Sequence, residues 1–229
     1  DDEAFWVSGA FGKVTMGETD GALDWAAGEV ALGTAIADDH TSQAGYYSFT
    51  GLDGLHDNQI VRYEYSFGDF AGAISAEMDD TGADDATLGI GVKWSGDFSG
   101  TAVTAGLGYQ SGELAGVSLD QTALSLSATM ANGFSANLGY ATGDFYGTYS
   151  GDWVGIGLGY TTGALLVQAN YGQWNGDAGF ADADGWGVVA NYDLGGGAVA
   201  MFGYGDGGNV GSPYAGAGSH WSAGLGLSF

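Results

Sequence analysis

The amino-acid sequence predicts an all-β protein, and within that class a transmembrane antiparallel β-barrel. Apolar residues recur at every second position through most of the 229 residues, which is the period of a strand with one apolar face. Short turns alternate along the chain with longer acidic or glycine-rich loops. The final segment keeps the alternation up to Phe229, whereas the end of a soluble chain is usually frayed and polar.

The composition excludes several classes of protein. The chain has 28 acidic and 3 basic residues, a net charge of −25, so it lacks the Lys and Arg with which nucleic-acid binders contact phosphate. It has no cysteine, which excludes disulfides, thiolate metal ligands and cysteine nucleophiles. No apolar run approaches the roughly 20 residues of a membrane helix. With 45% hydrophobic and 14% aromatic residues, the chain is also unlike a disordered protein.

Each predicted strand has one apolar face and one face of small or polar residues. In residues 86–94, for example, Leu88, Ile90 and Val92 alternate with Gly89 and Gly91. Thirteen strands are expected, at residues 4–9, 13–17, 59–67, 69–78, 85–95, 99–110, 118–130, 134–142, 152–161, 164–174, 183–193, 198–205 and 219–229.

The distribution of residue types over the two faces favours a membrane over a soluble sandwich. The polar faces hold Gly, Ser, Thr and Asn, whereas a solvated outer face normally carries Lys and Glu. Several apolar faces end in an aromatic just before a loop, as at Tyr109, Tyr140 and Tyr160, which suits the girdle at a membrane interface. The alternative is a soluble, acidic, glycine-rich β-protein, such as a calcium-binding or adhesion module.

The connections alternate in length, as in an outer-membrane barrel with short turns on one rim and long loops on the other. Short turns are expected near residues 10–12, 67–69, 95–97, 131–133, 162–163 and 194–196. Longer loops are expected at residues 79–84, 111–117, 144–151, 175–181 and 205–219. The segment 17–58 is far longer than the others, and a segment of that length without strand signals is usually functional.

The sequence resembles the general diffusion porins of alphaproteobacteria, of the Rhodobacter type. The resemblance is carried by FWVSGAFGKVTMG at residues 5–17, DNQIVRYEYS at 57–66 and YDLGGGA at 192–198. The aromatic C-terminus also resembles the signal read by the outer-membrane assembly machinery. The resemblance implies a sixteen-strand barrel, one domain over residues 1–229, in which residues 17–58 fold into the pore and constrict it.

That family's chain begins with further strands, so this sequence is expected to lack the first three of sixteen. A re-registered smaller barrel and a miscounted strand are the alternatives. The resemblance further implies a homotrimer in the bacterial outer membrane, in contact with lipid and lipopolysaccharide, with a periplasmic C-terminus. Its function would be passive diffusion of small hydrophilic solutes and ions, with no nucleic-acid partner.

The expected pore-lining residues come from the long loop and from the wall beside it. In the family an acidic loop faces arginines across the pore, and an acidic loop predicts a preference for cations. Strand parity places Arg62 and Glu64 in the lumen, with Lys93 as a weaker candidate near the periplasmic end. The acidic candidates of the loop are Glu18, Asp20, Asp24, Glu29, Asp38, Asp39, Asp53 and Asp57. A solvated surface is the alternative interpretation of these acids.

No cofactor is required for such a channel, but calcium is a candidate because so many carboxylates lack basic partners. The expected ligands are Asp79, Asp80, Asp84 and Asp85, although their spacing does not match an EF-hand. Surface charge and solubility alone also explain these acids.

The sequence gives little support to an enzyme. Three histidines, His40, His56 and His220, are candidate bases, but no Gly-x-Ser-x-Gly nucleophile elbow occurs. A hydrolase built on a barrel would need one of these histidines. The prediction is therefore a channel and not an enzyme.

Overall fold

The computed structural model describes residues 3–31, 51–145, 149–177, 182–207 and 218–228. These residues form one antiparallel sheet of thirteen strands and one short helix, α1 (Ala22–Ala26). The strands are β1 (Ala4–Gly9), β2 (Gly12–Glu18), β3 (Gln59–Phe67), β4 (Phe70–Glu77), β5 (Thr87–Phe98), β6 (Thr101–Leu114), β7 (Val117–Met130), β8 (Phe134–Phe145), β9 (Tyr149–Thr162), β10 (Leu165–Gly176), β11 (Ala183–Gly195), β12 (Ala198–Asp206) and β13 (Ser219–Leu227).

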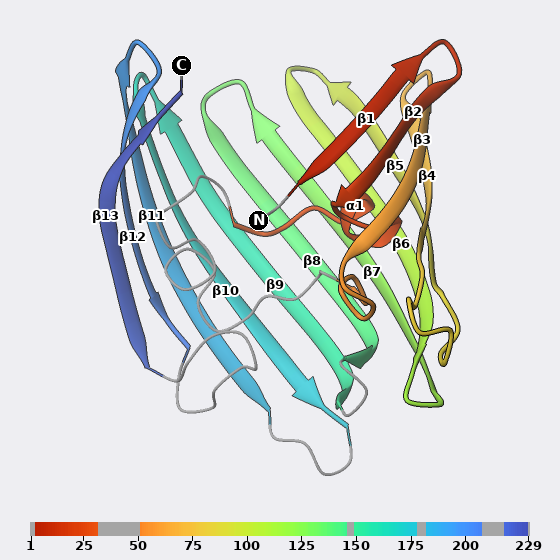
Figure 1. Cartoon of the computed structure of the whole chain (residues 1–229). Coiled ribbons are helices and arrows are strands. Elements are labelled where there is room, and N and C mark those ends of the chain that lie inside the picture. The colour runs from red at the N-terminus through yellow and green to blue at the C-terminus, as the bar shows by residue number, and fades with distance from the viewer. Residues whose placement is uncertain (1–2, 32–50, 146–148, 178–181, 208–217, 229) are drawn as a thin grey trace.

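The strands pair in sequence order, each with the strand before and after it, so the sheet is a simple meander. In the described part of the chain, β1 pairs with β2 and β13 with β12, and no pairing joins β1 to β13. The sheet is strongly curved, and α1 lies within its concave side (Figure 1). The concave side is called the inner face below.

The two faces of the sheet confirm the predicted alternation. On the outer face, Leu88 and Ile90 are 55% and 58% exposed, although both are large and apolar. On the inner face, Gln110, Gln121 and other polar residues are buried. A soluble sandwich would bury the first set and expose the second, so the sheet has the inverted polarity that a lipid environment requires.

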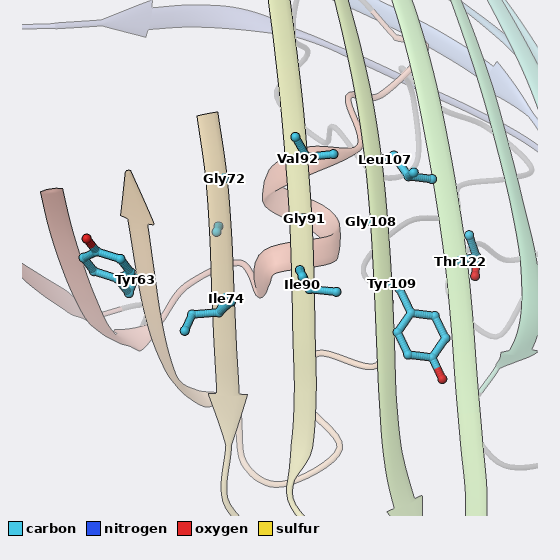
Figure 2. A pocket seen from close by; sticks show the side chains of 11 residues that line it. Tyr63, Gly72, Ile74, Ile90, Gly91, Val92, Leu107, Gly108, Tyr109 and Thr122 are labelled. Atoms are coloured by element: carbon cyan, nitrogen blue, oxygen red, sulfur yellow. The ribbon is translucent and has the colours of Figure 1, made fainter. Parts of the chain in front are cut away.

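Aromatic residues cluster at the rims of the sheet, as expected for interfacial girdles. At the rim of the short turns, the rings of Phe67 and Phe70 stack at a centroid distance of 5.9 Å, and those of Phe134 and Tyr160 lie 4.6 Å apart. The outer face between the rims is apolar. Figure 2 views part of this face, where side chains such as Ile74 and Ile90 project outward and line a hollow.

Three predicted connections are wrong. The loop expected at residues 144–151 is shorter, because β8 continues to Phe145 and β9 begins at Tyr149. Residues 111–117 were expected to form a long loop, but the chain turns tightly at Ala115 and Gly116, which both have positive φ. The turn expected at residues 95–97 lies instead at Ser99–Gly100. At residues 95–97 and 111–117, Gly and Ser lie within strands on both faces. Because these residues are also typical of turns, composition alone placed the turns too early.

A small apolar cluster lies between the inner face and the segment from α1 to Val30. It contains Leu23, Ala27, Val30, Ala123, Ala141 and Trp153. α1 itself spans only five residues, and no helix in the described ranges has the length and hydropathy needed to cross a membrane.

Candidate functional site

The first limb of the long segment, residues 19–31, runs along the inner face and contains α1. This helix was not expected from the sequence, because five residues are too few for a periodic signal. α1 packs on β4, β5, β6 and β7 through the buried side chains of Ala22, Leu23 and Ala26. In Figure 2 the helix lies behind the strands that carry Gly91 and Gly108.

Glycines of the inner face allow the backbone of this limb to approach the wall. A β-carbon at Gly106 would lie 1.9 Å from the carbonyl oxygen of Ala26, and one at Gly157 would lie 1.8 Å from that of Val30. Gly91 and Gly108 approach the backbone of Ala22 and Leu23 in the same way. These glycines let the limb backbone pack directly on the wall. The small residues of the inner face therefore position the limb as well as leaving room for water.

Side chains of the wall bind the backbone of the same limb. The hydroxyl of Ser75 on β4 accepts a hydrogen bond from the Ala22 N–H at 2.8 Å. The hydroxyl of Ser125 on β7 accepts one from the Gly28 N–H at 2.7 Å. Since both contacts involve the main chain, they fix the position of the limb independently of its side chains.

The second limb, residues 51–58, leads into β3 and is bound by two wall residues. Gln110 on β6 accepts a hydrogen bond from the Leu52 N–H through Oε1 at 2.8 Å. Glu77, the last residue of β4, is 1% exposed and accepts three backbone N–H groups of this limb. Neither residue was singled out from the sequence, although strand parity places both on the inner face.

Asp53 joins the two limbs to each other and to the wall. Its carboxylate accepts hydrogen bonds from the Gly21 N–H at 2.6 Å and from Gln110 Nε2 at 2.5 Å. Burial raises the pKa of Asp53 to about 6, because the charged form is poorly solvated, while these two hydrogen bonds act in the opposite direction. The negative charges of Glu77 and Asp20 contribute to this raised value.

The three basic residues of the chain, Lys13, Arg62 and Lys93, all lie on this side of the sheet. Arg62 is buried, donates a hydrogen bond to the Asp20 carbonyl oxygen, and lies 3.7 Å from the Asp20 carboxylate. Lys13 pairs with Glu64 at 3.1 Å. Nζ of Lys93 lies 4.3 Å from the centre of the Trp25 ring on α1.

The acids beside these bases are more numerous than the bases. The pKa of Asp24 on α1 is raised, first because the carboxyl is buried and then because Asp20, Asp53 and Glu29 lie nearby. Asp20 differs from Asp24 because its side chain is 62% exposed, whereas the side chain of Arg62 beside it is 6% exposed. The charge that faces the open space is therefore that of the carboxylate.

The structure brings many of the predicted pore residues together. Arg62, Glu64 and Lys93 lie on the inner face, in the same region as the limb residues Asp20, Asp24 and Asp53. Glu18 ends β2, while Glu29 and Asp57 are exposed. Asp38 and Asp39 lie outside the described residues. Whether any of these residues contacts a permeating solute stays a prediction.

Two of the predicted calcium ligands, Asp79 and Asp84, accept hydrogen bonds from backbone N–H groups. The Asp79 carboxylate accepts hydrogen bonds from backbone N–H groups of Thr81, Ala83 and Asp84, which lower its pKa. Asp84 accepts the N–H groups of Ala115 and Gly116 in the next turn. Asp80 and Asp85 are exposed. No group of three or more possible metal ligands occurs within the described ranges, and calcium binding stays a prediction.

The histidines considered as catalytic bases are not brought together in the described part of the chain. His56 is buried in the second limb and donates its backbone N–H to Glu77, while His220 is exposed on β13. His40 lies outside the described residues.

A curved sheet with apolar residues outside, polar residues inside and a chain segment bound to its inner wall defines a membrane channel built from β-strands. Comparison with known proteins agrees. The model of the Gram-negative porin family matches residues 1–212, so the chain belongs to that family, whose members are outer-membrane diffusion channels. This confirms the family resemblance inferred from the sequence. No curated protein sequence matches the chain significantly.

Solved structures with the same fold are porins. A porin structure refined at 1.8 Å resolution aligns with a TM-score of 0.74 and 22% identity, over 98% of this chain and 80% of its own length. Two engineered variants of the porin of Rhodopseudomonas blastica align with TM-scores of 0.71 and 0.69 and identities of 20% and 19%. Each alignment covers 99% of this chain and 76% of the variant. The predicted porin-type fold is thereby confirmed.

Proposed function

We propose that this porin is a cation-preferring channel for small hydrophilic solutes, in which the long segment 17–58 narrows the lumen. The described limbs of that segment lie on the inner face, where they occupy part of the cross-section. Water and solutes would pass between the limbs and the remaining inner wall. A narrow passage favours ions whose charge is opposite to that of its lining.

The observation that carries the cation preference is the state of the charged side chains. All three basic residues are engaged, either with a carboxylate or with the Trp25 ring. The side chain of Asp20, in contrast, is 62% exposed beside the buried Arg62. Because every basic side chain is engaged, and Asp20 is open beside the buried Arg62, the field in the lumen should attract cations.

The test is the reversal potential of single channels across a salt gradient in a planar bilayer. The wild-type channel should reverse at the sign that marks cation excess, and Asp20→Asn should move the potential toward zero. Asp97→Asn, which removes the same charge at the rim of β5, is the matched control and should have little effect. A wild-type channel that prefers anions would refute the proposal, and so would equal shifts in the two variants.

The assembly and its orientation are proposed together with this function. The family resemblance supports a homotrimer in the outer membrane, in contact with lipid and lipopolysaccharide, with its C-terminus on the periplasmic side. Cross-linking in outer membranes tests the trimer. Protease access to a tag at the C-terminus, before and after permeabilisation, tests the orientation.

A further inference from the structure

Glu77 holds a charge in a place where a charge is costly. It ends β4 on the inner face, is 1% exposed, and takes part in none of the ion pairs found among the described residues. A buried carboxylate without a basic partner needs strong hydrogen-bond donors to offset its loss of hydration. Its surroundings show where these donors come from.

Three backbone N–H groups of the second limb supply the donors. Oε1 of Glu77 accepts the N–H of His56 at 2.9 Å and that of Asn58 at 2.7 Å, and Oε2 accepts the N–H of Gly54 at 3.1 Å. Hydrogen bonds to an ionised acceptor are stronger than those between neutral groups. One side chain therefore binds three alternate residues of the limb.

The local sequence makes this convergence possible. Gly54, Asp57 and Asn58 have φ values of 83°, 65° and 59°, in the left-handed region that Gly, Asp and Asn tolerate best. Left-handed residues turn backbone N–H groups toward one side of a turn and form a concave site for an anion. Here the anion is the carboxylate of Glu77 itself.

The neighbours of Glu77 show how its contacts hold both limbs of the long segment in place. The residue is paired in the sheet with Ile60 on β3 and with Thr87 on β5, so its backbone is held on both sides. The limb that Glu77 binds also carries Asp53, which accepts a hydrogen bond from the Gly21 N–H near the start of the first limb. Loss of the Glu77 contacts would therefore loosen both limbs and not only the turn.

We propose that Glu77 is the positioning residue that fixes the second limb of the long segment on the channel wall, and that it thereby sets the width of the passage. The proposal rests on the proposed role of that segment as the constriction. Glu77 does not act as a pore charge, because both of its oxygens are occupied and its side chain is covered.

The test compares Glu77→Gln with Glu113→Gln in the full chain. Both variants remove one carboxylate, but Glu113 lies on β6 at a position of outward parity, away from the limb. In Glu77→Gln the amide nitrogen brings N–H donors into a site built from N–H donors. Hydrogen exchange at the amides of Gly54, His56 and Asn58 should accelerate roughly tenfold or more, while amides within β5 and β6 stay protected.

Single-channel recordings provide the functional measurement. Glu77→Gln should give an altered mean conductance and larger open-channel current fluctuations, whereas Glu113→Gln should match the wild type. Glu77→Asp keeps the charge but shortens the reach, so its exchange rates and conductance should lie between those of wild type and Glu77→Gln. This variant also serves as the test if Glu77→Gln does not fold.

The two measurements test the two parts of the proposal separately. Unchanged exchange at the three amides in both Glu77 variants would overturn the binding role of Glu77. Faster exchange with wild-type conductance would overturn its control of channel width. A separate experiment tests whether the long segment constricts the channel. If it does not, a variant with residues deleted from that segment should have the same conductance as the wild type.

Discussion

Gly106→Ala tests whether the wall is shaped to seat the long segment. The new β-carbon would lie 1.9 Å from the Ala26 carbonyl oxygen, and real β-carbons essentially never come closer than 3.0 Å to such an atom. The two groups must therefore separate by at least 1.1 Å, the difference between these two distances. Since β6 is paired along its length with β5 and β7, the first limb should move and the strand should stay.

The cost of this movement has two parts. Inserting a methyl group into a packed contact costs about 1–3 kcal/mol. The Gly28 N–H bond to Ser125, two residues beyond Ala26, would also be stretched, which adds about 1 kcal/mol. Because the limb is pushed away from the wall toward the lumen, the passage should narrow and the single-channel conductance should fall.

The assay combines thermal unfolding in detergent with single-channel conductance, and Gly72→Ala is the matched control. Gly72 lies on β4, and a β-carbon there would meet only the Gly91 carbonyl oxygen, at an ordinary contact distance of 3.8 Å. Gly106→Ala should unfold at a lower temperature and conduct less than Gly72→Ala. Equal unfolding temperatures and equal conductances in the two variants would refute the seating argument.

Three further predictions concern the charged residues around the limbs. Because the pKa of Asp53 is raised, the folded chain binds the proton of this carboxyl more tightly than the unfolded chain does. The stabilisation from this proton is complete below about pH 4 and is lost as the pH rises through about 6. The unfolding temperature should therefore fall over this pH range, and Asp53→Asn should weaken the pH dependence. Lys93→Met should cost about 0.5–2 kcal/mol by removing the cation above Trp25; an unchanged unfolding temperature and unchanged tryptophan fluorescence would contradict it. Arg62→Gln should lower the free energy of unfolding by about 3–5 kcal/mol, because it leaves buried polar groups unpaired. Lys13→Gln, at a more exposed pair, should lower it by no more than about 1 kcal/mol. Similar losses for the two variants in denaturation experiments would show that burial of Arg62 is unimportant.

Much of the fold could be predicted from the sequence because it depends on a local pattern. The period of two assigns each strand residue to one face, and it placed Arg62, Glu64 and Lys93 correctly on the inner face. The strands β3 and β8 begin where the alternation begins. Strand ends were less certain, as at Leu114 and Phe98, because small residues occur both in turns and at inner strand positions.

The contacts that hold the long segment were decided by the tertiary structure. Calcium binding by Asp79 and Asp84 stays a prediction, and the sequence did not show that each carboxylate accepts backbone N–H groups of a turn. Glu77 could be assigned to the inner face from parity, yet its role depends on N–H groups that the limb brings to it from residues 54–58.

The sequence by itself therefore determined the strands, their two faces and the membrane as the surroundings, since alternation and composition act within each strand. Only the tertiary structure decided where the long segment lies and which residues bind it. The physical reason is that these contacts are made to the main chain of the limbs: Gly106 lies against it, while Ser125 and Glu77 accept its N–H groups. Every residue has the same main-chain groups, so the order of side chains does not reveal such contacts.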